Sequence, residues 1–405
     1  MKDERYNFTI LNQTEFANLD DFVSKPSRKI FSDEVIFYLD QLSKILFKDP
    51  RSREYPDVGT FAFYCRKGNI NTLKKEYHKA NKNRLGRGLI FHISPSNVPV
   101  NFAYSLIAGL LSGNKNIVRV PTEGFEQIEA IIDAIDKNSE NLACREIADE
   151  IMLIRYKSED NDITDKLSAL CDVRVIWGGD ETIGRIRDSR LSPRAFDVTF
   201  SDRYSICIIN GDSFISEKDP SSVASGFYND TYLFDQNACT SPHLIVWLGD
   251  EKNVEKSKNI FWSELEKLVD EEYVIQPVQV VDKLTTFFNQ ALEMSKIELY
   301  ENKDNLIWRV KVLELEENID KFRCNSGYFS EYHADSLTDI SFIINSRYQT
   351  VSYYGFDRSE LEMFILENIP KGVDRIVPIG STMDFSLRWD GYNLINTFSR
   401  TIEII

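Results

Sequence analysis

Residues 173–184 read VRVIWGGDETIG, an apolar stretch followed by two glycines and a polar stretch. The β-branched residues at 173–177 predict a strand, and the residues after the glycines predict a helix. Glycines at such a turn let a ligand approach the backbone, where a helix N-terminus offers free N–H groups. We interpret Gly178 and Gly179 as a phosphate-binding turn of a nucleotide site. The alternative is a tight turn in which Asp180 serves as N-cap.

Strands and helices alternate on both sides of this turn. The patterns predict strands at 88–94, 116–120, 151–156, 173–177 and 205–209, separated by helices at 101–112, 123–137, 162–170 and 180–189. Apolar strands in this alternation are typical of a parallel sheet covered by helices on both faces. The pattern resumes further on, with strands at 244–248 and 306–313 and helices at 251–269 and 279–295. We therefore expect an α/β protein with two doubly wound, Rossmann-type domains.

Composition limits the partners and the compartment of the chain. Its 405 residues carry 64 acidic and 48 basic side chains, for a formal net charge of −16. Such an excess repels nucleic acid and anionic membranes. No run of about 18 apolar residues occurs, and no apolar leader follows the first residues, so we expect a cytoplasmic protein. The cysteines and histidines are scattered without metal-ligand spacing, and we expect no metal site and no disulfide scaffold.

One cysteine has a setting unlike the other five. Residues 234–243 read FDQNACTSPH, a polar loop of small residues that ends where the apolar strand at 244–248 begins. A thiol at the mouth of a buried strand can act as a nucleophile, and this is our interpretation of Cys239. An ordinary thiol has a pKa of about 8.5, so we expect helix N-terminal amides or a cation to lower it here. We expect His243 to pack in the strand, with a catalytic role as the alternative. We expect the remaining cysteines to be small core residues: Cys65, Cys144, Cys171, Cys207 and Cys324.

A second loop lies at the end of another predicted strand. Residues 91–99 read FHISPSNVP, in which two prolines stiffen the loop around Asn97. The carboxyl edge of a parallel sheet is where such folds bind ligands, and an amide fixed there can donate to an oxyanion. The alternative is an asparagine that only forms the turn.

The order of these motifs along the chain resembles the aldehyde dehydrogenase superfamily. The motifs are SPSNVP at 94–99, SGNKNIVRVP at 112–121, WGGDETIG at 177–184 and QNAC at 236–239. Within the superfamily the chain is most similar to the acyl-CoA reductases of bacterial bioluminescence operons. The C-terminal motifs DRIVPIG at 374–380 and WDGY at 389–392, with Phe385 and Ser399-Arg400, carry this closer likeness. The resemblance covers residues 85–405 and implies an aldehyde dehydrogenase-like fold with a small oligomerisation strand element.

The resemblance also implies roles for single residues. Cys239 matches the superfamily's nucleophile, and Asn97 matches its oxyanion-hole asparagine. Arg119 falls where the superfamily has a lysine that contacts the adenosine ribose, and Thr122 replaces an acidic residue. Because that acid would repel a 2′-phosphate, its absence favours NADP(H) over NAD(H). The implied cofactor-binding set is Ser94, Pro95, Ser96, Arg119, Thr122, Gly178, Gly179, Asp180 and Gly184.

These matches suggest a division of the chain. We expect a helical N-terminal extension over residues 1–84 that packs on the cofactor domain, and an NAD(P)-binding domain over 85–210. A catalytic cysteine domain would follow over 211–375. Residues 376–405 would return to the cofactor domain, and their alternating end suits pairing with another sheet, such as that of another subunit.

The resemblance further implies a reductase. Hydrolytic aldehyde dehydrogenases carry a glutamate that activates water, and Thr199 stands at its position here. A thioester on Cys239 would then survive until hydride arrives, as an NAD(P)H-dependent acyl-CoA reductase requires. Its substrate would be acyl-CoA or an acyl-protein thioester handed over by a partner protein, and we expect a homo-oligomer. The alternatives are an aldehyde dehydrogenase, an acyl-phosphate reductase and a non-reducing acyl-carrier subunit.

Overall fold

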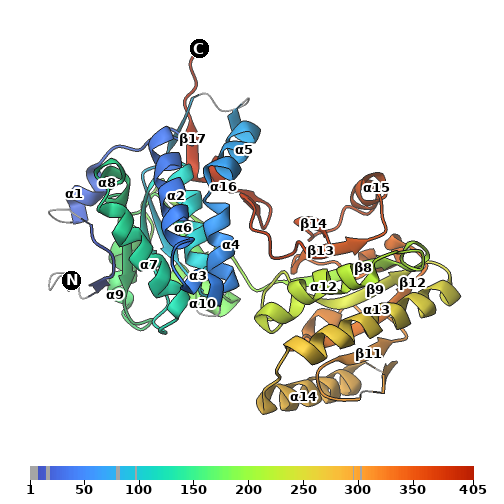
Figure 1. Ribbon diagram of the computed structural model, residues 1–405. Helices are drawn as coiled ribbons and strands as arrows, with labels where there is room; N and C mark the ends of the chain where they lie inside the picture. Colours follow the sequence, from blue (N-terminus) through green and yellow to red (C-terminus); the bar gives the residue numbers. More distant parts are fainter. Residues whose placement is uncertain (1–7, 15–18, 79–82, 96–97, 295, 302) are drawn as a thin grey trace. The chain divides into compact units, whose positions relative to one another are not determined.

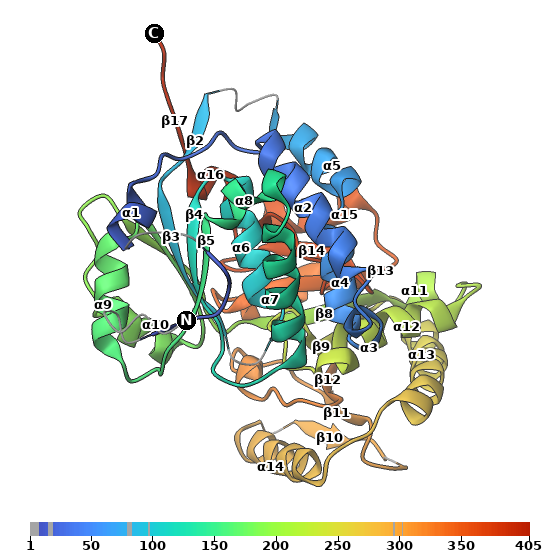
Figure 2. The ribbon, with the colours of Figure 1, turned by 60° about the vertical axis from the view of Figure 1, so that its left-hand side comes forward.

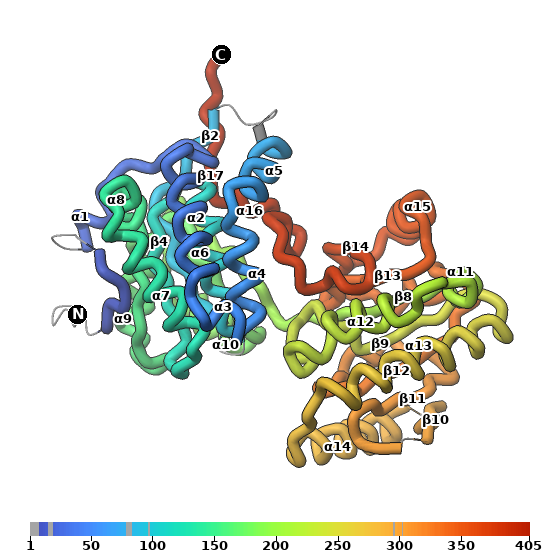
Figure 3. Tube along the Cα trace, viewed as in Figure 1, coloured from blue at the N-terminus to red at the C-terminus, as the bar shows by residue number. Residues whose placement is uncertain are grey.

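The computed structural model describes residues 8–14, 19–78, 83–95, 98–294, 296–301 and 303–405. The chain forms two compact units, one of residues 1–201 with 392–405 and one of residues 202–391 (Figure 1). It passes into the second unit after Ser201 and returns to the first after Gly391 (Figure 3). The functional division proposed from the sequence, with boundaries at 84, 210 and 375, stays a prediction.

Unit 1 is built on a six-stranded sheet of order β1-β5-β4-β3-β6-β7, in which only the β1–β5 pair is antiparallel. Its strands are β1 Thr9–Ile10, β3 Leu89–Ile93, β4 Lys115–Arg119, β5 Ile151–Arg155, β6 Val173–Trp177 and β7 Phe196–Phe200. Its central helices are α6 Asn101–Leu111, α7 Glu126–Ser139, α8 Leu142–Ala148, α9 Asn161–Leu170 and α10 Asp180–Arg187. The alternation of strand and helix predicted for this region is confirmed.

Helices cover both faces of this sheet, as its apolar strands require (Figure 2). Leu89, Phe91 and Ile93 of β3 join one core cluster, together with residues of α1 Leu19–Ser24, α9 and α10. The intervening His92 points the other way and meets Ser105 of α6. The N-terminal helices α2 Asp33–Leu46, α3 Arg51–Glu54, α4 Pro56–Tyr64 and α5 Lys67–His78 add a further layer, in which α2 contacts α7 and α8.

The C-terminal segment completes unit 1. After β16 Tyr392–Asn393 come a helix, α16 Leu394–Phe398, and a strand, β17 Ser399–Thr401. β17 pairs antiparallel with β2 Arg84–Gly86, so the strand expected to seek another sheet finds a partner within its own chain. The guanidinium of Arg84 donates hydrogen bonds to Ser399 and Thr401 and to the carbonyl of Asn396.

Unit 2 contains a seven-stranded sheet of order β10-β11-β12-β9-β8-β13-β14, parallel except for the β10–β11 pair. The strands of this sheet are β8 Tyr204–Asn210, β9 Pro242–Leu248, β10 Ile297–Leu299, β11 Trp308–Val312, β12 Tyr328–Ala334, β13 Tyr348–Tyr354 and β14 Arg375–Pro378. The short β15 Arg388–Trp389 pairs with β16 instead. The helices of unit 2 are α11 Gly211–Phe214, α12 Pro220–Thr231, α13 Glu251–Glu272, α14 Pro277–Glu293 and α15 Arg358–Asn368.

The strand at 204–210 corrects one expectation. We expected it to close the first sheet, whereas β8 lies in the second sheet between β9 and β13. Alternation along the chain shows that a strand is present, but the sheet it joins depends on partners that are distant in sequence.

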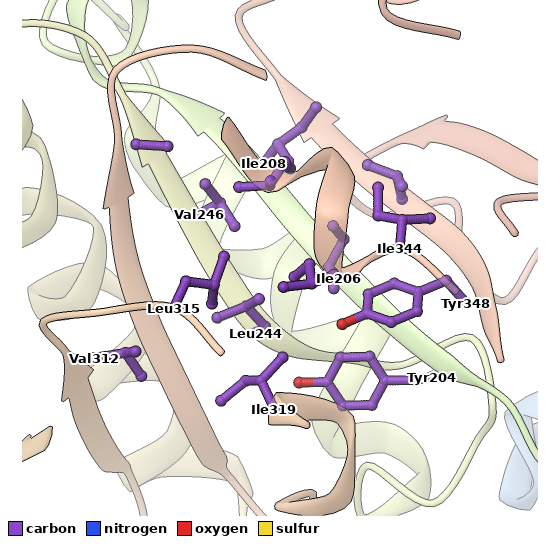
Figure 4. Packing of buried hydrophobic residues seen from close by; sticks show 14 of the residues in the cluster. Tyr204, Ile206, Ile208, Leu244, Val246, Val312, Leu315, Ile319, Ile344 and Tyr348 are labelled. Carbon is purple, nitrogen blue, oxygen red and sulfur yellow. The ribbon is translucent and has the colours of Figure 1, made fainter. Parts of the chain in front are cut away.

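Alternate residues of β8 and β9 divide the core of unit 2 between the two faces of its sheet. Ile206, Ile208, Leu244 and Val246 pack in one cluster, which Figure 4 shows with Tyr204 and Tyr348 at its edge. The intervening residues Cys207, Ile209, Ile245 and Trp247 pack against α12 and α13 on the other face. Among the described residues, no helix has both the length and the apolarity to cross a membrane.

Helix α14 has its polar side inward. Its buried residues are Lys283 and Gln290, while Val278, Val281, Leu284, Phe288 and Leu292 are exposed. The Lys283 ammonium donates to the carbonyls of Asn305 and Leu306 at 2.8 and 3.2 Å. Burial lowers the pKa of Lys283 to about 7. Specific polar contacts therefore decide which side of this helix faces the sheet.

Glu331 of β12 is fully buried yet has a complete set of partners. Arg309 of β11 donates to one carboxylate oxygen at 2.6 Å, and the indoles of Trp247 and Trp262 donate to the other at 2.9 and 3.1 Å. The Arg309 guanidinium also lies 4.6 Å from the centre of the Trp262 ring. A buried carboxylate that loses its cation is strongly destabilising.

The Arg309→Met variant should therefore lower the free energy of unfolding by about 3–5 kcal/mol, because Glu331 would remain buried without its cation. Lys267→Met is the matched control, since it removes an exposed helical pair with Glu264 and should change stability little. Urea unfolding followed by circular dichroism measures both. Equal stability of the two variants would contradict the expectation.

Candidate active site

The loop that carries Cys239 is held by a buried glutamine. Asp235 and Gln236 follow the short 3-10 helix at Tyr232–Phe234 and have left-handed backbone angles, with φ of 51° and 58°. The Gln236 amide nitrogen donates to the carbonyls of Pro242 and Tyr328, and its oxygen accepts from the N–H groups of Gly327 and Tyr328. One side chain thus fixes the start of β9 and the start of β12, and with them the position of Cys239.

The Gln236→Leu variant should leave these four buried backbone groups without their partner. We expect the free energy of unfolding to fall by about 2–4 kcal/mol, with faster hydrogen exchange in the Cys239 loop. Asn237→Ala is the control, because Asn237 lies in the same loop and is exposed. Unchanged exchange in Gln236→Leu would show that the loop does not depend on this amide.

Cys239 lies at the end of that loop, next to strands β8 and β13. The hydroxyl of Ser205 donates to the Cys239 carbonyl at 2.7 Å and accepts from the N–H of Thr350 at 3.2 Å. The side chain of Gln349, the neighbour of Thr350 in β13, lowers the pKa of the Cys239 thiol. The same amide donates through Nε2 to Oδ1 of Asp390. The backbone of Cys239 is therefore linked to β13 through Ser205.

The acidity of this thiol differs from the sequence expectation. The residue is partly exposed, but protein surrounds its thiol, and this burial raises the pKa of Cys239 to about 12. The carboxylates of Asp390 and Asp202 raise it further, against the lowering effects of Gln349 and Arg203. We expected amides or a cation to dominate and lower the value. Desolvation dominates instead, so the thiol is protonated at neutral pH.

Asp390 is the carboxylate that affects the thiol most strongly. It is buried, in a left-handed conformation with φ of 47°, and burial raises its pKa to about 6. Arg375 and Arg203 lower this pKa and Asp374 raises it. The Arg375 guanidinium lies 4.5 Å from the centre of the Trp389 ring and donates to the carbonyls of Thr382, Ser381 and Asp384. Asp390 is therefore a buried carboxyl group whose pKa lies above its ordinary value, and its negative charge raises the pKa of Cys239.

His243 has the surroundings of a packed residue. It lies in β9, and its ring stacks on Tyr204 with 5.7 Å between centroids. Burial, together with Arg323, lowers the pKa of His243 to about 3. The ring is therefore neutral and does not supply a cation that would acidify Cys239. The other cysteines are buried, apart from the partly exposed Cys324.

The double-glycine turn lies in unit 1, between β6 and α10. The N-cap of α10 is Gly179, and Asp180 is the first helical residue, so the alternative with Asp180 as N-cap is wrong. A Cβ added at Gly179 or at Gly184 would meet nothing within 4 Å. The packing of the protein does not require glycine at these two positions, which leaves room for a ligand beside the helix start.

Two buried polar atoms near the carboxyl ends of β3 and β4 find no hydrogen-bond partner in the described part of the chain. They are Oγ of Ser94 and Nε of Arg119. The Arg119 guanidinium lies 4.7 Å from the centre of the Tyr156 ring. Buried polar groups are normally satisfied, so two orphaned atoms at one sheet edge indicate a place for a polar ligand.

The remaining predicted residues have varied positions. Pro95 is partly exposed, and Thr122 is exposed beyond β4. Ser96 and Asn97 lie outside the described residues. Thr199 lies in β7, opposite Ile176 of β6. The predicted cofactor residues belong to unit 1, and Cys239 belongs to unit 2.

Sequence reasoning missed Gln349 and gave Asp390 no chemical role. Asp390 lies in the WDGY motif, which contributed only to the resemblance. Gln349 lies in a strand that local patterning did not predict, and it is recognised only by its buried hydrogen bond to the distant Asp390.

Solved structures similar to this chain are aldehyde dehydrogenases. Aldehyde dehydrogenase 21 from Physcomitrella patens, in complex with succinate, matches with a TM-score of 0.65 and 12% identity, over 95% of this chain and 89% of that one. A 1-pyrroline-5-carboxylate dehydrogenase from Thermus with bound NAD matches with a TM-score of 0.59 and 13% identity, over 94% and 82%. The fold is therefore the aldehyde dehydrogenase fold.

Curated relatives share sequence over most of the chain. The long-chain acyl-protein thioester reductases of Aliivibrio fischeri and Vibrio harveyi are each 26% identical over 73% of it. The matches cover 58% and 59% of those two proteins, so the chain spans less than two thirds of their length. The sequence pattern of one family, described as acyl-CoA reductase (LuxC), matches residues 70–401. The chain belongs to this acyl-CoA reductase family.

Proposed function

We propose that the chain reduces an acyl thioester to an aldehyde, with Cys239 as the nucleophile that carries the acyl group. The observation that carries this proposal is the Cys239 site, in which hydrogen bonds of Gln236 and Ser205 hold a partly exposed cysteine on a fixed loop before β9. Family membership and the names of the curated relatives support the acyl thioester as substrate class. Those names favour a substrate in which a protein carries the acyl group. Acyl-CoA serves as a soluble substitute for this substrate in experiments.

The chemistry assigns a task to each residue. The sulfur of Cys239 attacks the carbonyl carbon, and the leaving thiol departs from the tetrahedral intermediate. The N–H of Cys239 and the amide of Asn97 would donate to the oxyanion, a kind of contact that contributes about 3 kcal/mol each. Thr199 has no carboxylate to activate water, which favours reduction over hydrolysis and argues against an aldehyde-oxidising dehydrogenase.

A nicotinamide cofactor fits the residues of unit 1. The open positions at Gly179 and Gly184 suit a pyrophosphate at the start of α10, and the orphaned atoms of Ser94 and Arg119 offer polar contacts. When bound, this cofactor supplies the hydride that reduces the acyl group. Arg119 and the absence of an acid at Thr122 favour NADP(H).

The Cys239→Ala variant should lose both acyl labelling and NADPH oxidation, because no other thiol replaces the nucleophile. Incubation with a radiolabelled long-chain acyl-CoA, followed by absorbance at 340 nm after NADPH addition, measures the two steps. Cys324→Ala, which removes the other partly exposed cysteine, should keep both. Labelling without any NADPH oxidation in the unaltered chain would point to an acyl carrier instead.

The Arg119→Ala variant should lose more activity with NADPH than with NADH. We expect kcat/KM for NADPH to fall about tenfold, which corresponds to about 1.4 kcal/mol of lost interaction with a phosphate. Lys166→Ala, on the exposed side of α9, is the control. An equal loss with both cofactors would assign Arg119 to the part of the cofactor that they share.

A further inference from the structure

A buried carboxylate on α12 binds the segment that leaves β14. Asp230 lies in the last turn of α12 and is 1% exposed. One carboxylate oxygen accepts from the N–H of Gly380 at 2.7 Å, and the other accepts from the N–H of Thr382 at 3.0 Å. Burial raises the pKa of Asp230 to about 6, so the ionised group accepts both bonds at neutral pH. These charge-assisted bonds fix the backbone of a strap, which comprises residues 379–384.

Two further contacts hold the strap. The guanidinium of Arg375 in β14 donates to three carbonyls of the strap, at 2.9 to 3.4 Å. At Gly380, where φ is 92°, the strap touches α12 so closely that an added Cβ would lie 3.1 Å from the Cα of Gly226. Asp230 thus binds N–H groups of the strap, and Arg375 binds its carbonyls. These contacts leave the strap one position against α12.

The strap also contacts the loop that carries Cys239. The hydroxyl of the buried Thr240, the next residue after Cys239, donates to the sulfur of Met383 in the strap at 3.3 Å. Helix α12 leads into the same loop through a short 3-10 helix, and the N–H of Gln236 donates to the carbonyl of Thr231 at 2.7 Å. The loop therefore begins at α12 and ends against the strap, and Asp230 joins these two elements.

We propose that Asp230 is a positioning residue that sets Cys239 for attack on the acyl carbonyl. Its carboxylate fixes the strap, and the strap holds the end of the loop through the contact of Met383 with Thr240. This inference rests on the proposed function, because it assigns the place of the nucleophile relative to a bound acyl group. An attacking atom displaced by about 1 Å can react about a hundredfold more slowly.

Two reactions of the same thiol distinguish its position from its reactivity. Acylation by a bound acyl-CoA requires the sulfur to lie at the carbonyl carbon. Alkylation by iodoacetamide, a small reagent, depends on the ionisation and the accessibility of the thiol. A displaced nucleophile therefore loses acylation and keeps alkylation, whereas a damaged fold changes both. The ratio of the two rate constants reports the position of Cys239.

The experiment measures both rate constants at pH 8 in Asp230→Ala, in a Cys324→Ala background. Acylation is followed in single turnover with saturating tetradecanoyl-CoA without NADPH, and alkylation of Cys239 is followed by peptide mass spectrometry. We expect acylation to slow by about 10–100-fold and alkylation to change by less than about threefold. Acylation that keeps its rate, or that falls in step with alkylation, would overturn the inference.

A matched control weakens α12 without touching the strap. Asp219 is the N-cap of this helix, and its carboxylate accepts from the N–H of Ser222 at 3.2 Å. Asp219→Ala should therefore lower the stability of α12 and leave the ratio of acylation to alkylation unchanged. An equal fall of this ratio in Asp219→Ala and Asp230→Ala would show that general weakening of α12 suffices, and would contradict a specific role of Asp230.

A double variant tests whether the strap connects Asp230 to the loop. Met383→Ala removes the contact with Thr240 and should also slow acylation more than alkylation. Because both side chains act through the strap, the variant with both changes should acylate no more slowly than the slower single variant. Losses that multiply in the double variant would show independent effects, and would refute the connection through the strap.

Hydrogen exchange tests the strap without the reaction. Asp230→Ala should speed exchange at the N–H groups of Gly380 and Thr382 and in the loop around Cys239. If the unaltered chain is never acylated on Cys239, the proposed function fails, even where exchange confirms the hold of Asp230 on the loop. If the unaltered chain is acylated and exchange in the loop does not respond to Asp230→Ala, the inference fails and the proposed function stands.

Discussion

The Cys239 site is governed by the cost of forming a thiolate in a buried position, to which the negative charge of Asp390 adds. Desolvation makes the greatest contribution to the raised pKa of Cys239, and the charge of Asp390 adds to it. Reactive cysteines commonly have lowered pKa values, obtained from cations or helix N-termini. Here Arg203 forms an ion pair with Asp374, and its lowering effect on the pKa of Cys239 is smaller than that of burial. The site therefore favours the neutral form of the thiol, which ionises only when another group accepts its proton.

The scaffold holds this arrangement through buried polar contacts. Gln236 fixes the loop on one side of Cys239, Ser205 fixes its carbonyl, and Gln349 binds Asp390. Each of these side chains comes from a different segment, and parallel strands bring the segments to one region of the sheet. Buried amides and hydroxyls are costly unless they are paired, so each one specifies a single arrangement of its neighbours.

Local patterning predicted much of unit 1 and part of unit 2. The apolar strands at 89–93 and 173–177 stood out because they are buried on both faces. The strands at 328–334 and 348–354 were missed, since they bury polar residues such as Glu331 and Gln349, whose partners lie far away in sequence. Periodicity predicted a helix at 279–295, but only the contacts of Lys283 and Gln290 show which side faces inward.

The same limit applies to the candidate site. Cys239 was found because a thiol in a small polar loop before a strand is locally unusual. Its pKa was predicted in the wrong direction, because the burial that raises it arises only in the folded chain, and Asp390, which adds to it, lies some 150 residues away in sequence. The charge of a site depends on residues that come close together only in the folded state. A local sequence motif does not show which residues these are.

A raised pKa of the Cys239 thiol would affect the proposed reduction of a thioester at this residue. Thiolate nucleophilicity increases with pKa, and a thiol of lower pKa is the better leaving group. Cys239 would thus be a poorer leaving group than an ordinary thiol. The acyl-enzyme would therefore persist as long as no water is activated. A poor leaving group is a disadvantage after reduction, because Cys239 must then leave as the aldehyde forms.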